Sequence, residues 1–221
     1  MSVVTIERKV LEKNDEVALR NRTLFTDHGV YVINMVSSPG AGKTTILEKT
    51  IDLLKGKTRL AVIEGDVQTD IDARRIERSG IPAVQIVTRG GCHLEANLVH
   101  EALQSIKLAE LDLLVIENVG NLVCPANYDL GENVKVVVAS TTEGDDKPLK
   151  YPAMFRNAAV LLINKIDLVP YINARPDVLR KNAFSINPHL VVFETSALTN
   201  QGMDAWAQWL FDQAMKTKPA R

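Results

Sequence analysis

The fold of this chain is decided by the stretch Val30-Tyr31-Val32-Ile33-Asn34-Met35-Val36-Ser37-Ser38-Pro39-Gly40-Ala41-Gly42-Lys43-Thr44-Thr45. Its first half is rich in β-branched residues, which indicates a buried strand, and its second half is a short turn that contains two glycines. Residues 46–54 follow with apolar side chains at positions 47, 51 and 54, the spacing of one helix face. A strand, a glycine-containing turn and a helix in this order are the context of a phosphate-binding P-loop.

The turn predicts a site for a nucleoside triphosphate. Glycine lets backbone N–H groups turn inward, and the start of the helix adds a partial positive charge. We expect Lys43 to reach the β- and γ-phosphates and to act in catalysis, and the Thr44 hydroxyl to hold Mg²⁺. The stretch departs from the general pattern G-x-x-x-x-G-K-[ST] at Ser37, where another small residue replaces glycine. The predicted nucleotide contacts from this turn are Ser38, Gly40, Ala41, Gly42, Lys43, Thr44 and Thr45.

The composition is that of an ordinary globular protein. The 221 residues are 46% hydrophobic and carry a net charge of -1, so we expect no nucleic acid and no membrane as partner. The sequence has no apolar run of about 18 residues and no signal-peptide pattern, which predicts a cytoplasmic protein. The two cysteines, Cys92 and Cys124, are too few for a disulfide framework, and we expect them to be free or to bind a metal.

The rest of the chain alternates between predicted helices and strands. Residues 1–28 are predicted to form a helical extension, with one amphipathic helix or a broken pair over residues 5–28. Further strands are predicted at 60–66, 83–87, 113–117, 134–138, 160–164 and 190–195, and further helices at 68–79, 94–107 and 202–215. Continuously apolar strands separated by helices indicate a mostly parallel sheet covered on both faces. We therefore predict one doubly wound α/β domain over residues 1–221, a G-domain-like P-loop NTPase of about seven strands.

A second motif indicates which nucleotide is bound. Asn164-Lys165-Ile166-Asp167 follows a predicted strand and matches the N-K-x-D tetrapeptide with which GTP-binding proteins recognise guanine. A carboxylate at Asp167 accepts from two donors of guanine that adenine does not match. Lys165 is expected to lie along the base and Asn164 to tie loops together, while Ser196-Ala197-Leu198 resembles the second base-contacting motif. The tetrapeptide alone is also compatible with a surface turn, but together with the P-loop it predicts GTP.

Three acidic residues are candidate partners of Mg²⁺. Asp66 and Glu117 each end a predicted strand, and Asp72 lies six residues after Asp66. We predict catalytic roles for Asp72 and Glu117, and we expect the N–H of Gly120 to contact the γ-phosphate and to sense its loss. Alternatively, each acid caps a helix or pairs with an arginine such as Arg74 or Arg75. No glutamine or arginine finger stands out, which predicts slow intrinsic hydrolysis of GTP.

The cysteines indicate a second kind of site. Cys92-His93 and Cys124-Pro125 lie in two loops that we expect to leave the carboxyl ends of central strands, near each other and near the γ-phosphate. Two thiolates and an imidazole suit Zn²⁺ or Ni²⁺. Three ligands do not close a structural site, but a two-fold dimer would bring two sets together. Alternatively, the cysteines are small buried residues without a ligand.

Taken together, these segments resemble the HypB family, the GTPase accessory proteins that help insert nickel into [NiFe] hydrogenases. The resemblance covers roughly residues 30–200 and rests on the segments 37–44, 117–125, 140–147 and 164–167, together with Cys92-His93. It implies GTP/GDP with Mg²⁺, a homodimer promoted by GTP, and Ni²⁺ or Zn²⁺ held at its interface by Cys92, His93 and Cys124. It also implies a HypA-like metal-transfer partner and a [NiFe] hydrogenase large subunit as recipient.

The resemblance also implies a switch in which GTP and Mg²⁺ order residues 66–72 and 117–124, close the dimer and alter the metal geometry. Some family members carry a Cys-rich or His-rich N-terminal nickel tract, which this chain lacks. Three other readings remain open at the level of sequence. They are a urease-type nickel GTPase of the UreG class, a P-loop small-molecule kinase, and a metal-binding module in which the nucleotide is a structural clamp.

Overall fold

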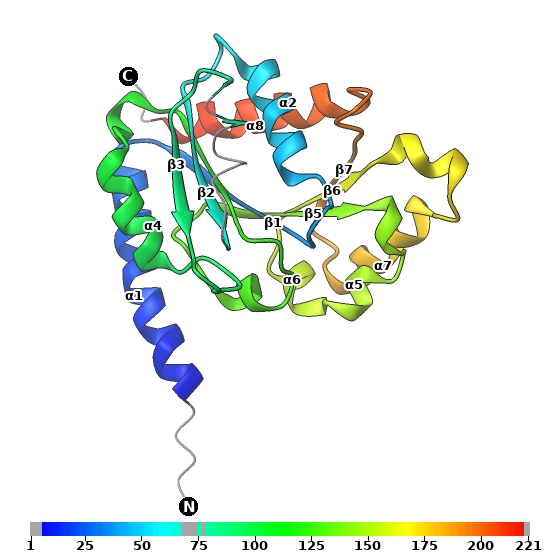
Figure 1. The fold of residues 1–221 in the computed structure, drawn as a ribbon, viewed down its shortest axis with the longest axis horizontal. Coiled ribbons are helices and arrows are strands. Elements are labelled where there is room, and N and C mark those ends of the chain that lie inside the picture. Colours follow the sequence, from blue (N-terminus) through cyan, green and yellow to red (C-terminus); the bar gives the residue numbers. More distant parts are fainter. Residues whose placement is uncertain (1–5, 68–74, 77, 219–221) are drawn as a thin grey trace, which may run out of the picture.

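The computed structural model describes residues 6–67, 75, 76 and 78–218, with side chains from Val10 onward. Seven strands form one sheet in the order β3-β2-β4-β1-β5-β6-β7 (Figure 1). All neighbouring pairs are parallel, so the sheet is entirely rather than mostly parallel. The strands are β1 (Tyr31–Ser37), β2 (Leu60–Asp66), β3 (Ala83–Val87), β4 (Leu113–Glu117), β5 (Val134–Ser140), β6 (Val160–Asn164) and β7 (Val191–Glu194).

Helices cover both faces of this sheet, which confirms the predicted doubly wound α/β fold. In Figure 1, α2 (Lys43–Leu54) and α8 (Met203–Thr217) lie on one face, and α1 (Ile6–Asp27) and α4 (Ala96–Ala102) lie together on the other. The second face also carries α5 (Lys147–Lys150), α6 (Pro152–Arg156) and α7 (Pro176–Ile186). Short 3₁₀ turns are η1 (Leu103–Ser105), η2 (Leu108–Glu110), η3 (Cys124–Asn127), η4 (Thr141–Glu143) and η5 (Ile166–Tyr171). None of the described helices has both the length and the apolar character needed to cross a membrane.

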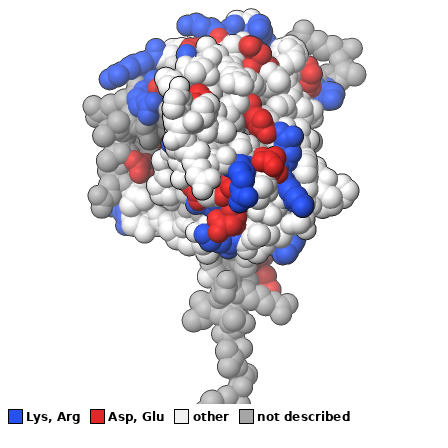
Figure 2. Space-filling view, turned by 90° about the vertical axis from the view of Figure 1, so that its right-hand side faces the viewer, with Lys and Arg blue, Asp and Glu red and all other residues white. Residues whose placement is uncertain are grey.

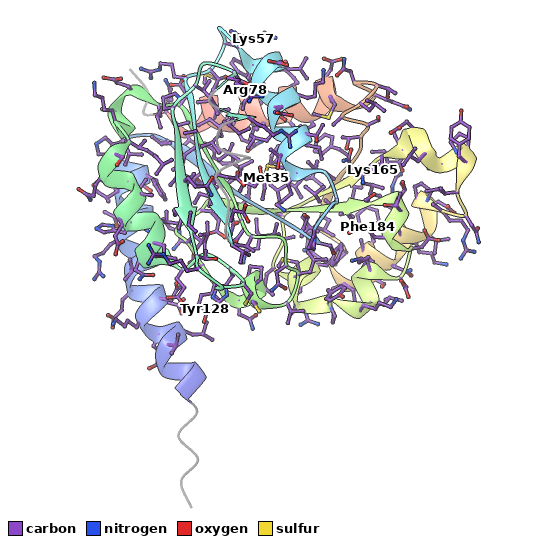
Figure 3. All side chains as sticks on the ribbon, viewed as in Figure 1. Met35, Lys57, Arg78, Tyr128, Lys165 and Phe184 are labelled. Carbon is purple, nitrogen blue, oxygen red and sulfur yellow. The ribbon has the colours of Figure 1, made fainter. Side chains whose placement is uncertain are left out.

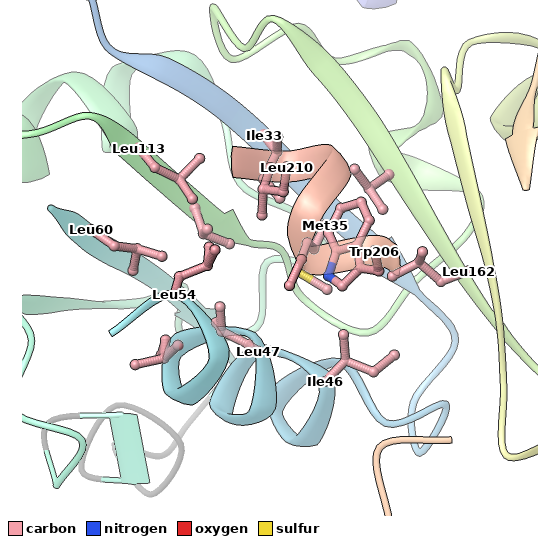
Figure 4. Packing of buried hydrophobic residues seen from close by; sticks show 14 of the residues in the cluster. Ile33, Met35, Ile46, Leu47, Leu54, Leu60, Leu113, Leu162, Trp206 and Leu210 are labelled. Carbon is pink, nitrogen blue, oxygen red and sulfur yellow. The ribbon is translucent and has the colours of Figure 1, made fainter. Parts of the chain in front are cut away.

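The central strand β1 is buried along its whole length. Ile33 and Met35 point towards α2 and α8, where they pack against Leu47 and Trp206 (Figure 4). The intervening side chains of β1 point to the opposite face, where Val32 and Val36 belong to two separate apolar clusters. Burial on both faces explains why the strand reads as a continuous apolar run, and it makes Asn34, which lies between these two valines, an exception.

Several predicted boundaries differ from the structure. The predicted helix at 94–107 is shorter, because α4 begins at Ala96 and the chain becomes extended at Ile106 after η1. The helix α7 was not predicted, although Pro176 at its first position and the buried pair Leu179 and Ala183 are helix signals. Of the predicted helix at 68–79, residues 75 and 76 are helical, and 68–74 and 77 lie outside the described residues.

The surface seen in Figure 2 carries intermixed acidic and basic side chains. The described residues include ion pairs of this kind between Arg180 and Glu194 and between Lys150 and Asp146. Because opposite charges pair locally, this face presents no extended field of one sign, in keeping with a net charge of -1.

Candidate functional site

The P-loop lies between β1 and α2 and takes its shape from two glycines. Gly40 and Gly42 have φ angles of 75° and 100°, the left-handed region that disfavours side chains. Helix α2 begins at Lys43, so its first N–H groups face the loop. Ser37, where the general pattern has glycine, is the last residue of β1 and is buried in extended backbone. Its hydroxyl accepts a hydrogen bond of 3.0 Å from Lys43 Nζ, so serine contributes a contact that glycine would lack.

A pocket of about 560 Å³ opens in front of this loop, at the carboxyl ends of β2 and β4. The P-loop forms one wall, and the segments that end β2 and β4 form another. Its lining comprises Pro39, Gly40, Gly42, Lys43, Thr44, Thr45, Glu64, Gly65, Asp66, Val67, Arg75, Glu117, Asn118, Val119, Gly120 and Lys165. A ligand beyond the carboxyl ends of the strands is the arrangement expected of an open α/β sheet.

Carboxylates and a hydroxyl meet at the floor of this pocket. Thr44 Oγ1 donates a hydrogen bond of 2.8 Å to Glu117 Oε1, and both residues are buried. Glu64 on β2 lies in register with Glu117 on β4 and is also buried, while Asp66 is half-buried at the pocket rim. Asp72 lies outside the described residues. Glu64 was not predicted as a site residue, although residues two apart on a strand share a face, which pairs it with Asp66.

The predicted base-contacting segments lie against the P-loop from the β6 side. Asn164 Nδ2 donates to the carbonyl of Ala41 at 2.9 Å, and Lys165 Nζ donates to the carbonyl of Gly40 at 2.7 Å. Lys165 adopts a left-handed backbone (φ 62°) and lies next to the start of α2 in Figure 3. The N–H of Ala197 donates to Asn164 Oδ1 at 3.4 Å, so the two segments meet at one side chain.

The remaining residues of these segments differ in exposure. Asp167 is half-buried at the start of η5. Ser196 and Ala197 are buried, whereas Leu198 is 81% exposed.

One further cation reaches the P-loop from α5. Lys147 Nζ donates to Ser38 Oγ at 2.5 Å and lies 3.7 Å from Glu143 Oε1. The segment 140–147 contributes to the resemblance to the HypB family, but Lys147 was not predicted as a site residue. Its position depends on a contact between parts of the chain 109 residues apart.

Cys92, His93 and Cys124 form a compact group. Their ligand atoms all lie within 4.8 Å of one another, and Cys92 Sγ is 3.5 Å from His93 Nδ1. No other set of three or more potential ligands of this kind occurs among the described residues. The ring of His93 packs on Tyr128 with a centroid separation of 3.9 Å, and Figure 3 shows Tyr128 on the side of the sheet away from α2.

The surroundings of this group shift two pKa values. Hydrogen bonding with the Cys124 thiol, together with burial, raises the pKa of Cys92. Burial lowers the pKa of His93, which favours the neutral imidazole that binds metals. Two thiols and a neutral imidazole whose ligand atoms lie within 4.8 Å of one another are a soft donor set for a metal ion.

The route by which Cys92 reaches Cys124 differs from the prediction. Cys92 follows β3, which is one of the two edge strands of the sheet rather than a central strand. The loop returns across β2, and a Cβ placed on Gly65 of β2 would lie 2.8 Å from the side chain of Leu94. Glycine at position 65 therefore leaves the space through which the loop passes to the end of β4.

Comparisons with known proteins show which family the chain resembles. The family model described as "CobW/HypB/UreG, nucleotide-binding domain" matches residues 31–194. The chain is 50% identical over 208 residues to hydrogenase maturation factor HypB of Azotobacter chroococcum, covering 94% of this chain and 68% of the relative. It is 48% identical over 211 residues to HypB of Escherichia coli K12, covering 96% and 73% of the two chains. The crystal structure of Helicobacter pylori HypB in complex with nickel is similar, with a TM-score of 0.88, 38% identity, and coverage of 94% and 98%.

Proposed function

This chain belongs to the CobW/HypB/UreG family of nucleotide-binding domains, and within it to the hydrogenase maturation factors HypB. From that premise we propose that it is a GTP-hydrolysing metallochaperone that couples GTP-dependent dimerisation to the delivery of nickel into a [NiFe] hydrogenase. The observation that carries the proposal is that one loop serves both sites. Residues 117–120 line the nucleotide pocket, and Cys124 of the same loop joins Cys92 and His93.

The guanine nucleotide occupies the pocket of about 560 Å³ in this proposal. Lys43 and the N–H groups at the start of α2 hold the phosphates. The carboxylate of Asp167 and the backbone around Ala197 receive the base, with Lys165 along its face. Water attacks the γ-phosphorus, the bond to the β-γ bridging oxygen breaks, and GDP and phosphate leave. Lys147 adds a positive charge on the phosphate side, because it contacts Ser38 of the P-loop.

The chemistry of the floor fits Mg²⁺. Thr44, Glu117 and Glu64 place a hydroxyl and two buried carboxylates together, and Asp66 adds a third carboxylate at the rim. Hard oxygen donors of this kind hold Mg²⁺ with help from the substrate phosphates, and buried carboxylates are stabilised by a nearby cation. When bound, Mg²⁺ supplies charge neutralisation at the phosphates. The chain's own part is to hold the Thr44 hydroxyl and the Glu117 carboxylate towards the same point.

The metal cargo binds to Cys92, His93 and Cys124 in this proposal. Ni²⁺ and Zn²⁺ both suit two thiolates and an imidazole. The solved relative from Helicobacter pylori was crystallised with nickel, which supports Ni²⁺ as the cargo. Cys92 is exposed and Cys124 is half-buried, so a second copy of the chain has access to the group and can complete the coordination. A HypA-like protein donates or receives the ion, and the hydrogenase large subunit is the final recipient.

The proposal is tested by metal titration of the protein with GDP and with a non-hydrolysable GTP analogue, together with light scattering of both forms after size exclusion. We expect a dimer in the analogue form and a change in metal affinity or stoichiometry between the two states. A coupling of 1–3 kcal/mol, roughly 5–150-fold, is typical of linked sites. The same affinity, stoichiometry and mass in both states would contradict the coupling. Release of phosphate from GTP without any added acceptor distinguishes a GTPase from a small-molecule kinase.

A further inference from the structure

A network of buried polar side chains crosses the face of the sheet opposite α2. Its members are Asn118, Asn34, Glu132 and Lys135, and each has less than a tenth of its surface exposed. Asn34 is the exception noted on β1, and it lies in register with Lys135 on β5. Burying four polar side chains beside apolar clusters costs free energy unless each polar group has a hydrogen-bond partner. The hydrogen-bond partners of these four side chains therefore show which segments of the protein they hold in place.

One end of this network holds the loop that carries Cys92 and His93. Asn118 Oδ1 accepts a hydrogen bond of 3.0 Å from the N–H of Leu94, and it accepts another of 3.0 Å from the N–H of Val119. Asn118 Nδ2 donates to Asn34 Oδ1 at 3.2 Å. The amide of Asn118 is therefore used on both sides, with its oxygen towards the cysteine loop and its nitrogen towards β1.

The other end holds the 3₁₀ turn that begins with Cys124. Asn34 Nδ2 donates to Glu132 Oε1 at 3.1 Å, and Lys135 Nζ lies 3.9 Å from the same oxygen. Lys135 Nζ donates to the carbonyls of residues 125, 126 and 128, at 3.0, 3.1 and 3.0 Å. These carbonyls belong to η3 and the residue after it, so one buried ammonium holds the turn that presents Cys124.

This network of polar side chains is joined directly to the nucleotide pocket. Glu117 and Asn118 are consecutive residues whose side chains point to opposite faces of the sheet, as alternation along a strand requires. Glu117 receives the Thr44 hydroxyl on the α2 face, and Asn118 holds the cysteine loop on the other. The N–H of Asn118 donates to the carbonyl of Met35 at 2.9 Å, so the strand pairing continues through this position.

We infer that Asn118 is the positioning residue of the metal group, and that it acts through Asn34, Glu132 and Lys135 to hold the two cysteine loops as one unit attached to the end of β4. This inference rests on the proposed function, because it assumes that Cys92, His93 and Cys124 bind a metal. A displacement of the end of β4 when the nucleotide changes then moves the Cys92–His93 loop through the buried side chain of Asn118, beside the exposed hydrogen bond of 3.2 Å that Asn121 Nδ2 donates to the carbonyl of Cys92. Hydrogen bonds that orient ligands in this way typically change metal affinity by about 10–100-fold when removed.

The test is titration with Co²⁺, whose absorption reports both thiolate binding and coordination geometry, without nucleotide, with GDP and with a non-hydrolysable GTP analogue. For Asn118→Ala we expect about tenfold weaker binding of Co²⁺ and an altered visible spectrum. The matched control is Thr50→Val, which removes the buried hydrogen bond of 3.0 Å that Trp206 Nε1 donates to Thr50 Oγ1, between α2 and α8 on the opposite face of the sheet. This control is expected to lower the unfolding temperature and to leave the cobalt spectrum unchanged.

A second variant keeps the test decisive if Asn118→Ala does not fold. The double substitution Glu132→Gln with Lys135→Met removes both buried charges together and leaves no unpaired ion. It is expected to weaken Co²⁺ binding through the Cys124 side. A folded Asn118→Ala protein, or the folded double variant, with wild-type cobalt affinity and spectrum would overturn the inference. If the wild type binds Co²⁺ equally with GDP and with the analogue while Asn118→Ala still binds about tenfold more weakly, the proposed coupling fails and the positioning role stands.

Discussion

Replacing Gly42 by alanine tests the contact on which the nucleotide site is built. Gly42 has a φ of 100°, and a Cβ placed there would lie 2.5 Å from Asn164 Nδ2. Asn164 uses this nitrogen to bond the carbonyl of Ala41 at 2.9 Å. An alanine therefore strains the backbone of the P-loop and also pushes away the side chain that joins the P-loop to the predicted base-contacting segments.

The expected magnitude follows from these two effects. A left-handed conformation costs a residue with a Cβ about 1–2 kcal/mol. Loss of the buried hydrogen bond from Asn164 costs about 1 kcal/mol more. The sum of about 2–3 kcal/mol corresponds to a fall in the unfolding temperature of roughly 5–10 °C for a protein of this size.

Gly40 provides the matched control in the same loop. It has a φ of 75°, but nothing lies within 4 Å of a Cβ at this position. Gly40→Ala is therefore expected to show the backbone strain alone, about 1–2 kcal/mol, without disturbing Asn164. The assay is thermal unfolding of the nucleotide-free variants by circular dichroism, followed by titration with a fluorescent GDP analogue. We expect Gly42→Ala to lose at least about tenfold more affinity for the analogue than Gly40→Ala, because the base-contacting segments lose their anchor.

Equal unfolding temperatures for the two variants would refute this reasoning. That result would mean that the contact between position 42 and Asn164 adds nothing to the strain of the loop. A Gly42→Ala protein that keeps wild-type affinity for the GDP analogue would show that Asn164 does not connect phosphate binding to base binding.

Three other predictions concern the stability, the metal group and the base. Burial opposes ionisation of Asp112, but hydrogen bonds from Arg59 and Lys218 outweigh it and hold the pKa at about 2, below the ordinary value of 3.8. Ionised Asp112 therefore stabilises the fold above pH 4 by about 2 kcal/mol, and this stabilisation is lost as the pH falls towards 2. In urea unfolding, Asp112→Asn is expected to be about 2 kcal/mol less stable than the wild type at pH 7, and its stability is expected to fall less in acid. Cys124→Ser is expected to weaken Ni²⁺ binding by at least about tenfold, seen as loss of thiolate-to-nickel absorption, with GDP affinity unchanged. Asp167→Asn is expected to bind GTP about 100-fold more weakly and to accept xanthosine triphosphate, measured by competition; unchanged GTP affinity would exclude Asp167 from base recognition.

Much of the fold was predictable, because its main signals are local. The run from Val30 to Ser37 predicted a strand buried on both faces, and β1 is one. The glycines at 40 and 42 predicted a short turn in which backbone N–H groups point inward, and the structure has a turn there with positive φ at both glycines. The missed helix α7 shows where such reading fails, since its short apolar stripe of Leu179 and Ala183 is easily read as part of a loop.

The candidate site was predictable only as a set of separate segments. The P-loop, Glu117, the N-K-x-D segment and the two cysteine loops were each identified from their own residue types. Strand alternation places Glu64 on the same face as Asp66, but it does not show which residue of a neighbouring strand Glu64 faces. Its partner is set by the register of β2 with β4, which places it beside Glu117.

The sequence by itself determined the strand, turn and helix that bind phosphate, the residues suited to guanine and the soft ligands suited to nickel, because each depends on neighbours along the chain. Only the tertiary structure decided that β3 lies at the edge, that the Cys92 loop returns over Gly65, and that Asn118 joins this loop to β4. The physical reason is that strand order and loop paths are set by which apolar faces bury one another and by which buried polar groups find partners. Those partners lie many residues apart, and no local pattern records them.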